Sequence, residues 1–239
     1  MNDSVTLLIP EKADVEFEEV FKSWTLQGGK IKRLGKYWIR DEELGRQKIA
    51  IYGNQAFALV LSQIYDVELV FPDDTLIVRL DKKWTKRNIQ LKTIDEITED
   101  FFPAFIKPVI PKIFLAGIFE NLFDFKSSTS GLENTGQVMI STIVDDISAE
   151  ARSYIKEGDV KDIALYEGNA DLASGIKFLK DFVTENLKEL PTVVVIDLAF
   201  SKSIGWFILE FNACWGAGLN NCKAEKVIDC IVSATINRN

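Results

Sequence analysis

The residues with the clearest chemical potential lie near the C-terminal end of the sequence, in two apolar segments joined by a short polar turn. Asp197 interrupts the apolar run VVVIDLAF, where an ionised carboxylate is costly unless it is paired or bound to a metal. If residues 201–205 close a β-hairpin, Asp197 comes opposite Glu210 to within about one residue, and Glu210 and Asn212 share a face. Mg²⁺ is typically held by one or two carboxylates together with substrate phosphates. Either carboxylate alone is better explained as a solvated residue at a sheet edge, but the three together predict a metal site that also binds a nucleotide.

Two lysines earlier in the chain are candidate phosphate contacts. Lys107 ends the short apolar segment AFIK, and Pro108 prevents the strand from continuing. An ammonium group in that position can act as a point charge on a phosphate, although a solvated strand-end lysine is the common alternative. Lys112 lies in the helix-like segment 111–123, either as a second phosphate or substrate contact or as a surface residue.

A third candidate is the segment SAEAR at 148–152. Glu150 and Arg152 alternate onto one face of the expected strand there. The pattern indicates either a cross-strand ion pair or a ribose-binding glutamate beside a phosphate-binding arginine.

Composition narrows the chemistry available to the chain. The sequence of 239 residues contains no histidine, which excludes catalysis by Ser-His-Asp or Cys-His groups and histidine metal ligation. A formal net charge of -8 argues against a nucleic-acid-binding surface. There is no secretory signal pattern and no apolar run of membrane-spanning length, so we expect a cytoplasmic protein that does not bind a membrane. Three cysteines near the C-terminus are expected to be free, buried thiols.

Hydrophobic periodicity predicts the elements that must position these residues. Expected strands and helices alternate over the first 100 residues, as in a small α/β lobe, and a capping-box pattern starts at Thr93. The later part is rich in strands and contains two long helices. Expected strands cover 5–9, 36–39, 48–52, 67–71, 75–80, 104–107, 137–144, 150–155, 162–166, 192–200 and 205–212, and expected helices cover 14–26, 172–183 and 223–236, with another that follows Asn54.

Taken in chain order, these motifs resemble those of the ATP-grasp superfamily. The similarity rests on FIKP with Lys107, on ExR at 150–152, on the Asp197 strand and on LEFN (209–212) followed by WGAGL, and it covers roughly residues 100–225. It is greatest to the clade defined by one arginine and two lysines, whose counterparts here are Arg152, Lys107 and Lys112.

The resemblance implies an α+β ATP-grasp fold in which a small N-terminal α/β lobe (1–100) precedes a nucleotide-binding and catalytic region (101–239) of two α+β subdomains that clamp ATP. It also implies that loop 127–136 takes the place of the family's flexible phosphate-covering loop. The implied roles are ATP phosphate binding for Lys107, adenine binding for Ser141, Thr142, Ile143 and Val144, a position near the ribose for Glu150, Mg²⁺ binding for Asp197, Glu210 and Asn212, and contact with the transferred phosphoryl group or the acyl substrate for Arg152 and Lys112.

The activity implied by the clade is a Mg-ATP-dependent carboxylate–amine ligase that works through an acyl phosphate. ATP and Mg²⁺ would be its cofactors, and its partners would be a carboxylate and an amine supplied by an amino acid, a peptide or a protein. Two alternatives remain open at this point: a kinase or phosphotransferase with the same Mg-ATP site, and a non-catalytic nucleotide-binding protein. Phosphoryl transfer suits a chain without histidine, because it depends mainly on positioning and on charge stabilisation by Mg²⁺, Lys and Arg.

Overall fold

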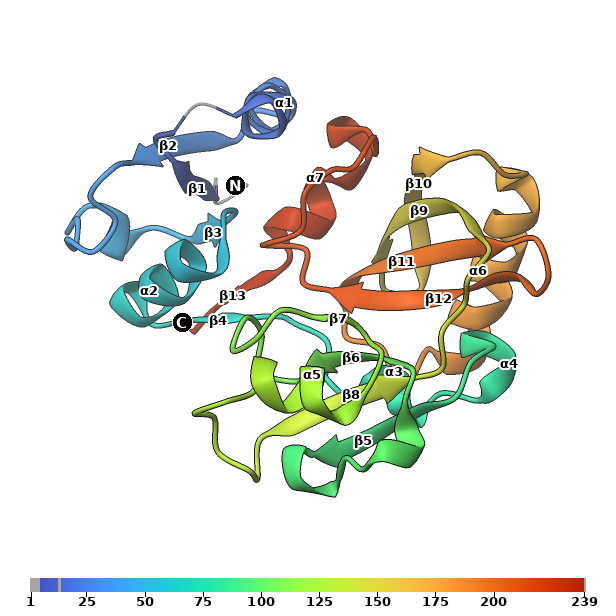
Figure 1. Cartoon of the computed structure of the whole chain (residues 1–239). Helices are drawn as coiled ribbons and strands as arrows, with labels where there is room; N and C mark the ends of the chain where they lie inside the picture. The colour runs from blue at the N-terminus through green and yellow to red at the C-terminus, as the bar shows by residue number, and fades with distance from the viewer. Residues whose placement is uncertain (1–4, 13, 239) are drawn as a thin grey trace. The chain divides into compact units, whose positions relative to one another are not determined.

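The computed structural model describes residues 5–12 and 14–238, which form two compact units (Figure 1). Of the described residues, unit 1 contains 5–12, 14–72, 149–198 and 210–238, and unit 2 contains 73–148 and 199–209. Strands and helices occur in both, as expected for the α+β class. The domain boundary expected at residue 100 stays a prediction.

The N-terminal part of unit 1 is a three-stranded parallel sheet in the order β2-β1-β3, covered by helices. Its helices begin at capping residues that accept hydrogen bonds from the first turn: Asp14 binds the backbone N–H of Glu16, and Asn54 binds that of Phe57. The elements are β1 (Thr6–Pro10), α1 (Val15–Leu26), β2 (Lys30–Leu34), a 3₁₀ turn η1 (Leu44–Arg46), β3 (Ile49–Ile51) and α2 (Gln55–Tyr65).

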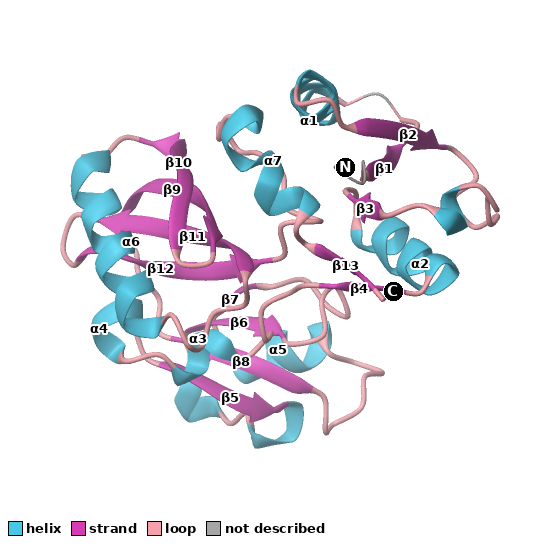
Figure 2. Ribbon diagram, turned by 180° about the vertical axis from the view of Figure 1, so that it is seen from behind, coloured by secondary structure: helices cyan, strands magenta, loops and turns pink. Residues whose placement is uncertain are grey.

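Most of the remainder of unit 1 is a four-stranded sheet in the order β10-β9-β11-β12, of which residues 147–148, 199–201 and 205–209 are assigned to unit 2 (Figure 2). Helix α6 packs on it through Phe182, whose ring centroid lies 6.1 Å from that of Phe211. Strands β4 and β13 pair antiparallel, which joins the C-terminal segment to the N-terminal part of the chain. The elements are β4 (Val67–Leu69), β9 (Ile147–Lys156), β10 (Asp159–Gly168), α6 (Leu172–Asn186), β11 (Val193–Ser201), β12 (Gly205–Asn212), α7 (Ala224–Val232) and β13 (Thr235–Asn237).

The three cysteines lie in the apolar core of unit 1 as free thiols, which confirms the expectation from their sequence context. Burial raises the pKa of Cys222 and of Cys230 to about 12, and raises the pKa of Cys214 well above its ordinary value.

Because the three thiols are buried, we expect a thiol-specific reagent to label the denatured chain readily at neutral pH and the native protein only very slowly. Because these folded pKa values exceed the ordinary value of about 9, the thiols favour the folded state at neutral pH, and this contribution is lost as the pH rises from about 9 toward 12. Rapid labelling of the native protein would contradict the burial.

Unit 2 contains a four-stranded sheet in the order β5-β8-β6-β7. Its core is aromatic and aliphatic, with Phe125 at the centre of edge-on contacts to Phe114 and Phe119. The expected capping box at Thr93 and Glu96 is confirmed, and it opens a 3₁₀ turn. The elements are α3 (Leu76–Arg79), α4 (Lys82–Thr85), β5 (Ile89–Thr93), η2 (Ile94–Glu96), η3 (Glu99–Phe101), β6 (Ala104–Pro108), β7 (Gly117–Phe119), α5 (Leu122–Ser128) and β8 (Gln137–Ser141).

Several of the expected elements are wrong. Residues 36–39 form a turn closed by the hydrogen bond from Ile39 N to Lys36 O, with the Trp38 and Ile39 side chains largely exposed. The expected strand at 75–80 is helix α3, because the carboxylate of Asp73 binds the backbone N–H and the hydroxyl of Thr75 and starts a helical turn. The C-terminal helix ends at residue 232 rather than 236, and β13 follows it.

Candidate functional site

The three side chains predicted to bind a metal lie together on two neighbouring strands. Asp197 comes from β11, and Glu210 and Asn212 come from β12. The side-chain nitrogen of Asn212 donates hydrogen bonds to Asp197 Oδ2 at 3.0 Å and to Glu210 Oε1 at 3.1 Å. The amide therefore bridges the two carboxylates, and the convergence expected from the strand periodicity is present.

Arg152 reaches the same cluster from β9, which pairs with β11 on the other side. Its Nε donates to Asp197 Oδ1 at 2.9 Å and its Nη2 donates to Asp197 Oδ2 at 2.7 Å, a two-pronged ion pair. Burial acts against the guanidinium charge, but the hydrogen bonds and the charge of Asp197 outweigh it and raise the pKa of Arg152. Burial raises the pKa of Asp197, and the hydrogen bonds and charge of Arg152 act against that rise.

Glu150 takes a different partner from the one expected of a cross-strand ion pair. Its carboxylate accepts a hydrogen bond from the hydroxyl of Tyr166 on β10. Partial burial raises the pKa of Glu150, and the nearby negative charges of Asp197 and Glu210 act in the same direction. The guanidinium of Arg152 lies 5.9 Å from the centre of the Tyr166 ring. The strand β9 thus aims both residues of the ExR segment toward the acidic cluster, and the ribose role of Glu150 stays a prediction.

In unit 2, Lys107 and Ser141 occupy one face of the sheet. Strands β6 and β8 pair antiparallel with Lys107 opposite Met139 and Phe105 opposite Ser141, so these side chains point away from the aromatic core. Burial and the charge of Asp73 raise the pKa of Asp74, and the positive charge of the nearby Lys107 acts against that rise. Lys107 and Ser141 therefore lie on the same face of the sheet, where Ser141 is buried and its hydroxyl donates to Thr142 O at 2.9 Å.

The stretch expected to line an adenine ring is strand only at its start, because β8 ends at Ser141. Thr142 continues the pairing for one residue: its backbone N–H donates to Asn88 O at 3.0 Å, and its hydroxyl accepts from Asn88 N at 3.2 Å. Ile143 and Val144 follow as half-buried loop residues. The adenine-binding role of the stretch stays a prediction.

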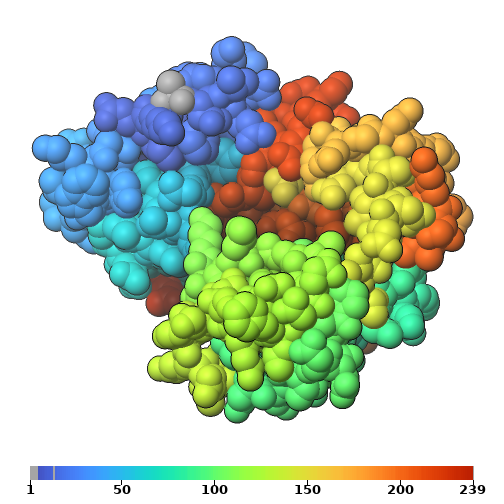
Figure 3. All heavy atoms as spheres, viewed as in Figure 1, coloured from blue at the N-terminus to red at the C-terminus, as the bar shows by residue number. Residues whose placement is uncertain are grey.

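Lys112 does not lie on a helix. It occupies the loop 109–116 between β6 and β7, where its φ of 67° places it in the left-handed region. This loop directly follows Lys107 and carries the exposed apolar side chains Ile110 and Leu115. It belongs to the green segment in the space-filling view (Figure 3).

The loop 127–136 is held to its surroundings by backbone hydrogen bonds. Ile94 N donates to Gly136 O at 3.0 Å, and Asp95 N donates to Asn134 O at 3.1 Å. These bonds hold the end of the loop to η2, and the covering role that the resemblance implied for the loop stays a prediction.

Sequence reasoning misses the contacts of Arg87. Its Nη1 donates to Ile208 O at 2.8 Å, and its Nη2 donates to Leu209 O at 2.9 Å, the two carbonyls that immediately precede Glu210. The basic run that contains Arg87 has the composition of a solvated surface, and nothing in composition reveals that its guanidinium binds strand carbonyls.

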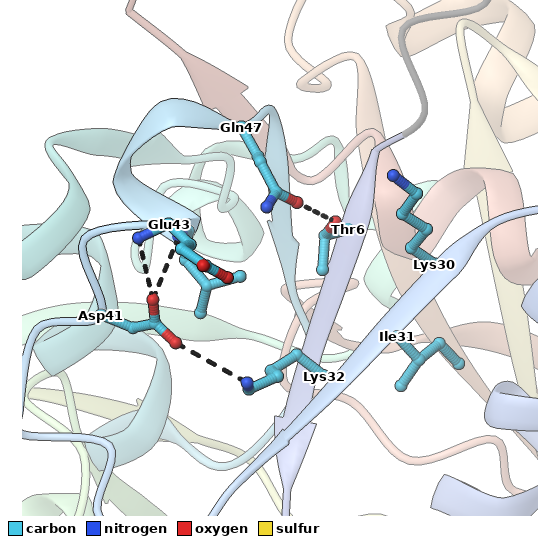
Figure 4. A pocket seen from close by; sticks show the side chains of 8 residues that line it. Thr6, Lys30, Ile31, Lys32, Asp41, Glu43 and Gln47 are labelled. Atoms are coloured by element: carbon cyan, nitrogen blue, oxygen red, sulfur yellow. Dashed lines mark hydrogen bonds and ion pairs between the residues drawn. The ribbon is translucent and has the colours of Figure 1, made fainter.

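A cavity of about 300 Å³ lies at the amino-terminal ends of β1 and β2, and its lining differs from that of the acidic cluster (Figure 4). Its polar side chains bond one another: Thr6 donates to Gln47 at 2.8 Å, and Lys32 lies 3.6 Å from Asp41. Ligands of open parallel sheets bind at the carboxyl ends of the strands, so this cavity is a poor candidate for the functional site.

The donor set of the acidic cluster fits a hard cation that is also held by phosphate oxygens. The two carboxylates supply the oxygen ligands that Mg²⁺ takes in such sites, whereas Asn212 would offer its amide oxygen only after the amide turns over, because its side-chain nitrogen faces both carboxylates. Within residues 5–12 and 14–238, no group of three or more Asp, Glu, Cys or His side chains could hold a metal by itself. The cluster is thus suited to a metal that arrives with a nucleotide, and its metal-binding role stays a prediction.

Comparison with known proteins identifies the family that this arrangement resembles. A model of ATP-grasp domains, for family 2 of the clade named after one arginine and two lysines, matches residues 84–230. No curated protein matches the chain in sequence. In the part of the chain that the structure describes, no helix is both long enough and apolar enough to cross a membrane.

Solved structures share the fold at low sequence identity. A D-alanine–D-alanine ligase from Bacillus anthracis matches with a TM-score of 0.60 and 12% identity, over 97% of this chain and 96% of that one. The D-cycloserine synthetase DcsG matches with a TM-score of 0.60 and 10% identity, over 96% and 98%. The macrocyclase MdnC from Microcystis aeruginosa MRC, solved with the precursor peptide MdnA, matches with a TM-score of 0.57 and 9% identity, over 96% and 99%. These likenesses establish the fold along nearly the whole chain.

Proposed function

Because the chain belongs to family 2 of the one-arginine, two-lysine clade of ATP-grasp domains, we propose that it uses Mg-ATP to join a carboxylate to an amine through an acyl phosphate. The observation that carries the proposal is the cluster of Asp197, Glu210 and Asn212, held within hydrogen-bonding distance on adjacent strands. A buried arginine pairs with one of its carboxylates and opposes the rise in pKa that burial causes there. Two carboxylates and an amide gathered in this way are the donors that a nucleotide-bound divalent cation needs.

Each candidate residue is proposed to take a role that follows from its chemistry. Asp197, Glu210 and Asn212 would hold Mg²⁺, which when bound neutralises phosphate charge and stabilises the charge that develops during transfer. Lys107 would bind the ATP phosphates as a point charge. The others are proposed to bind the adenine (Ser141, Thr142, Ile143 and Val144), the ribose (Glu150) and the transferred phosphoryl group or acyl substrate (Lys112).

We propose an amino acid or a peptide as the substrate class. The support comes from the solved structures with the same fold, whose names include a D-alanine–D-alanine ligase and a macrocyclase bound to a precursor peptide. Either substrate would supply the carboxylate that receives the phosphoryl group, and the amino group of a second substrate would attack the acyl phosphate. ATP and Mg²⁺ are the proposed cofactors.

The activity is tested by following ADP formation with pools of amino acids and short peptides as carboxylate and amine donors. We expect ADP release that requires the carboxylate and yields a stable amide when the amine is present. Hydroxylamine should replace the amine and trap the acyl phosphate as a hydroxamate. A phosphorylated product that accumulates without any amine would instead identify a kinase, and a calorimetric titration that shows no binding of Mg-ATP at millimolar nucleotide would indicate a non-catalytic relative.

A further inference from the structure

All three guanidinium nitrogens of Arg152 donate hydrogen bonds to other groups of the protein. Two of its three nitrogens are bound to Asp197, and the third, Nη1, donates to the carbonyl of Gly218 at 2.9 Å. Its side chain is only 11% exposed, and that of Asp197 is 1% exposed. The planar fork of the guanidinium is thus fixed in the protein by three separate bonds.

The carbonyl that Arg152 binds belongs to the loop 213–222, which directly follows the last proposed metal ligand, Asn212. Two buried tyrosines hold the same loop from the core of unit 1. The hydroxyls of Tyr52 and Tyr154 each lie 3.1 Å from Ala217 O, and that of Tyr154 also lies 3.0 Å from Gly218 O. The loop is therefore fastened to the sheet at two successive carbonyls, and Arg152 is the only one of these three donors that also binds a proposed metal ligand.

We propose that Arg152 is a positioning residue that fixes Asp197 and the loop 213–222 in one geometry, rather than a residue that contacts the transferred phosphoryl group. This inference rests on the proposed function, because it assigns the geometry to a Mg-nucleotide site. A lysine cannot do the same work, since its ammonium is a single point charge and cannot bind both carboxylate oxygens and a carbonyl in one plane. Partners that orient a metal ligand in this way generally matter about as much as the ligands they hold.

The affinity for Mn²⁺ with ADP separates the two roles, because ADP lacks the phosphoryl group that is transferred. Electron paramagnetic resonance titration of Mn²⁺ in the presence of ADP should show binding about 10- to 100-fold weaker in Arg152→Lys than in the wild type. Hydrogen exchange of the amides in 213–222 should become faster in the same variant. If Arg152 contacted only the transferred group, Mn²⁺–ADP affinity and loop exchange would both equal those of the wild type.

Arg33→Lys is the matched control, because it makes the same substitution in unit 1 at an arginine paired with Glu18 on the surface. It should leave the Mn²⁺–ADP affinity and the hydrogen exchange of 213–222 unchanged. A wild-type protein that binds no Mn²⁺–ADP would overturn the proposed function and this inference together, whereas wild-type binding that Arg152→Lys retains in full would overturn the inference alone.

If Arg152→Lys does not fold, crystal structures of the wild type decide the matter. The bonds from Arg152 to Asp197 should be kept both with Mg-ADP and with a non-hydrolysable ATP analogue. A guanidinium that leaves Asp197 to bind the terminal phosphate of the analogue would refute the positioning role.

Discussion

Glu210→Gln is expected to lower ADP formation by a factor on the order of 10²–10³ while leaving the fold intact. Glu210 supplies one of only two carboxylates in the proposed metal site, and glutamine has the same shape without the charge. The Oε1 atom that accepts from Asn212 is retained in the amide, and the side chain is only half-buried, so the packing of β12 should not change. The loss should therefore fall on the metal and the reaction rather than on stability.

Steady-state ADP release and thermal unfolding measured on the same preparations test this expectation. Glu225→Gln is a suitable control, because it neutralises an exposed glutamate in the first turn of α7. It should retain wild-type turnover. A Glu210→Gln enzyme with unchanged turnover would remove Glu210 from the metal site and, with it, the main support for the proposed function.

The hairpin that carries the acidic cluster can be predicted from sequence because its signals are local. Strand alternation and a polar turn place β12 at residues 205–212, as the structure has it. The same periodicity puts Glu210 and Asn212 on one face and brings Asp197 near them, and the hydrogen bonds of Asn212 show that it does. Wherever neighbouring strands are joined by a short turn, register follows from the turn.

The interactions that sequence reasoning misses depend on residues far apart in the chain. Arg152 and Asp197 are separated by 45 positions, and their pairing follows from the placement of β9 beside β11, which no local pattern specifies. The helix α3 reads as a strand in sequence because its apolar run is too short for periodicity to distinguish the two, and the turn set by Asp73 decides the outcome. Side-chain bonds to backbone, such as those of Arg87 to the carbonyls before Glu210, leave no trace in hydrophobicity at all.

Asp197→Ala should destabilise the protein by about 3–5 kcal/mol, because it leaves the charge of Arg152 buried without a partner. The pair is almost fully enclosed, with 1% of the Asp197 side chain exposed, so water cannot readily replace the lost carboxylate. The free energy of unfolding from urea denaturation measures the effect. A loss below about 1 kcal/mol, the range of an exposed ion pair, would show that the guanidinium finds solvent in the variant.

The double variant Arg152→Met, Asp197→Leu separates stability from function. Replacing a buried ion pair by apolar residues of similar volume is often neutral or stabilising by about 1–4 kcal/mol, since neither charge then has to be desolvated. We expect the double variant to unfold at a urea concentration close to that of the wild type and yet to form no ADP. If the double variant is as stable as the wild type but inactive, then Arg152 and Asp197 serve the geometry of the nucleotide–metal site. The free energy of unfolding then comes mainly from the apolar core around them.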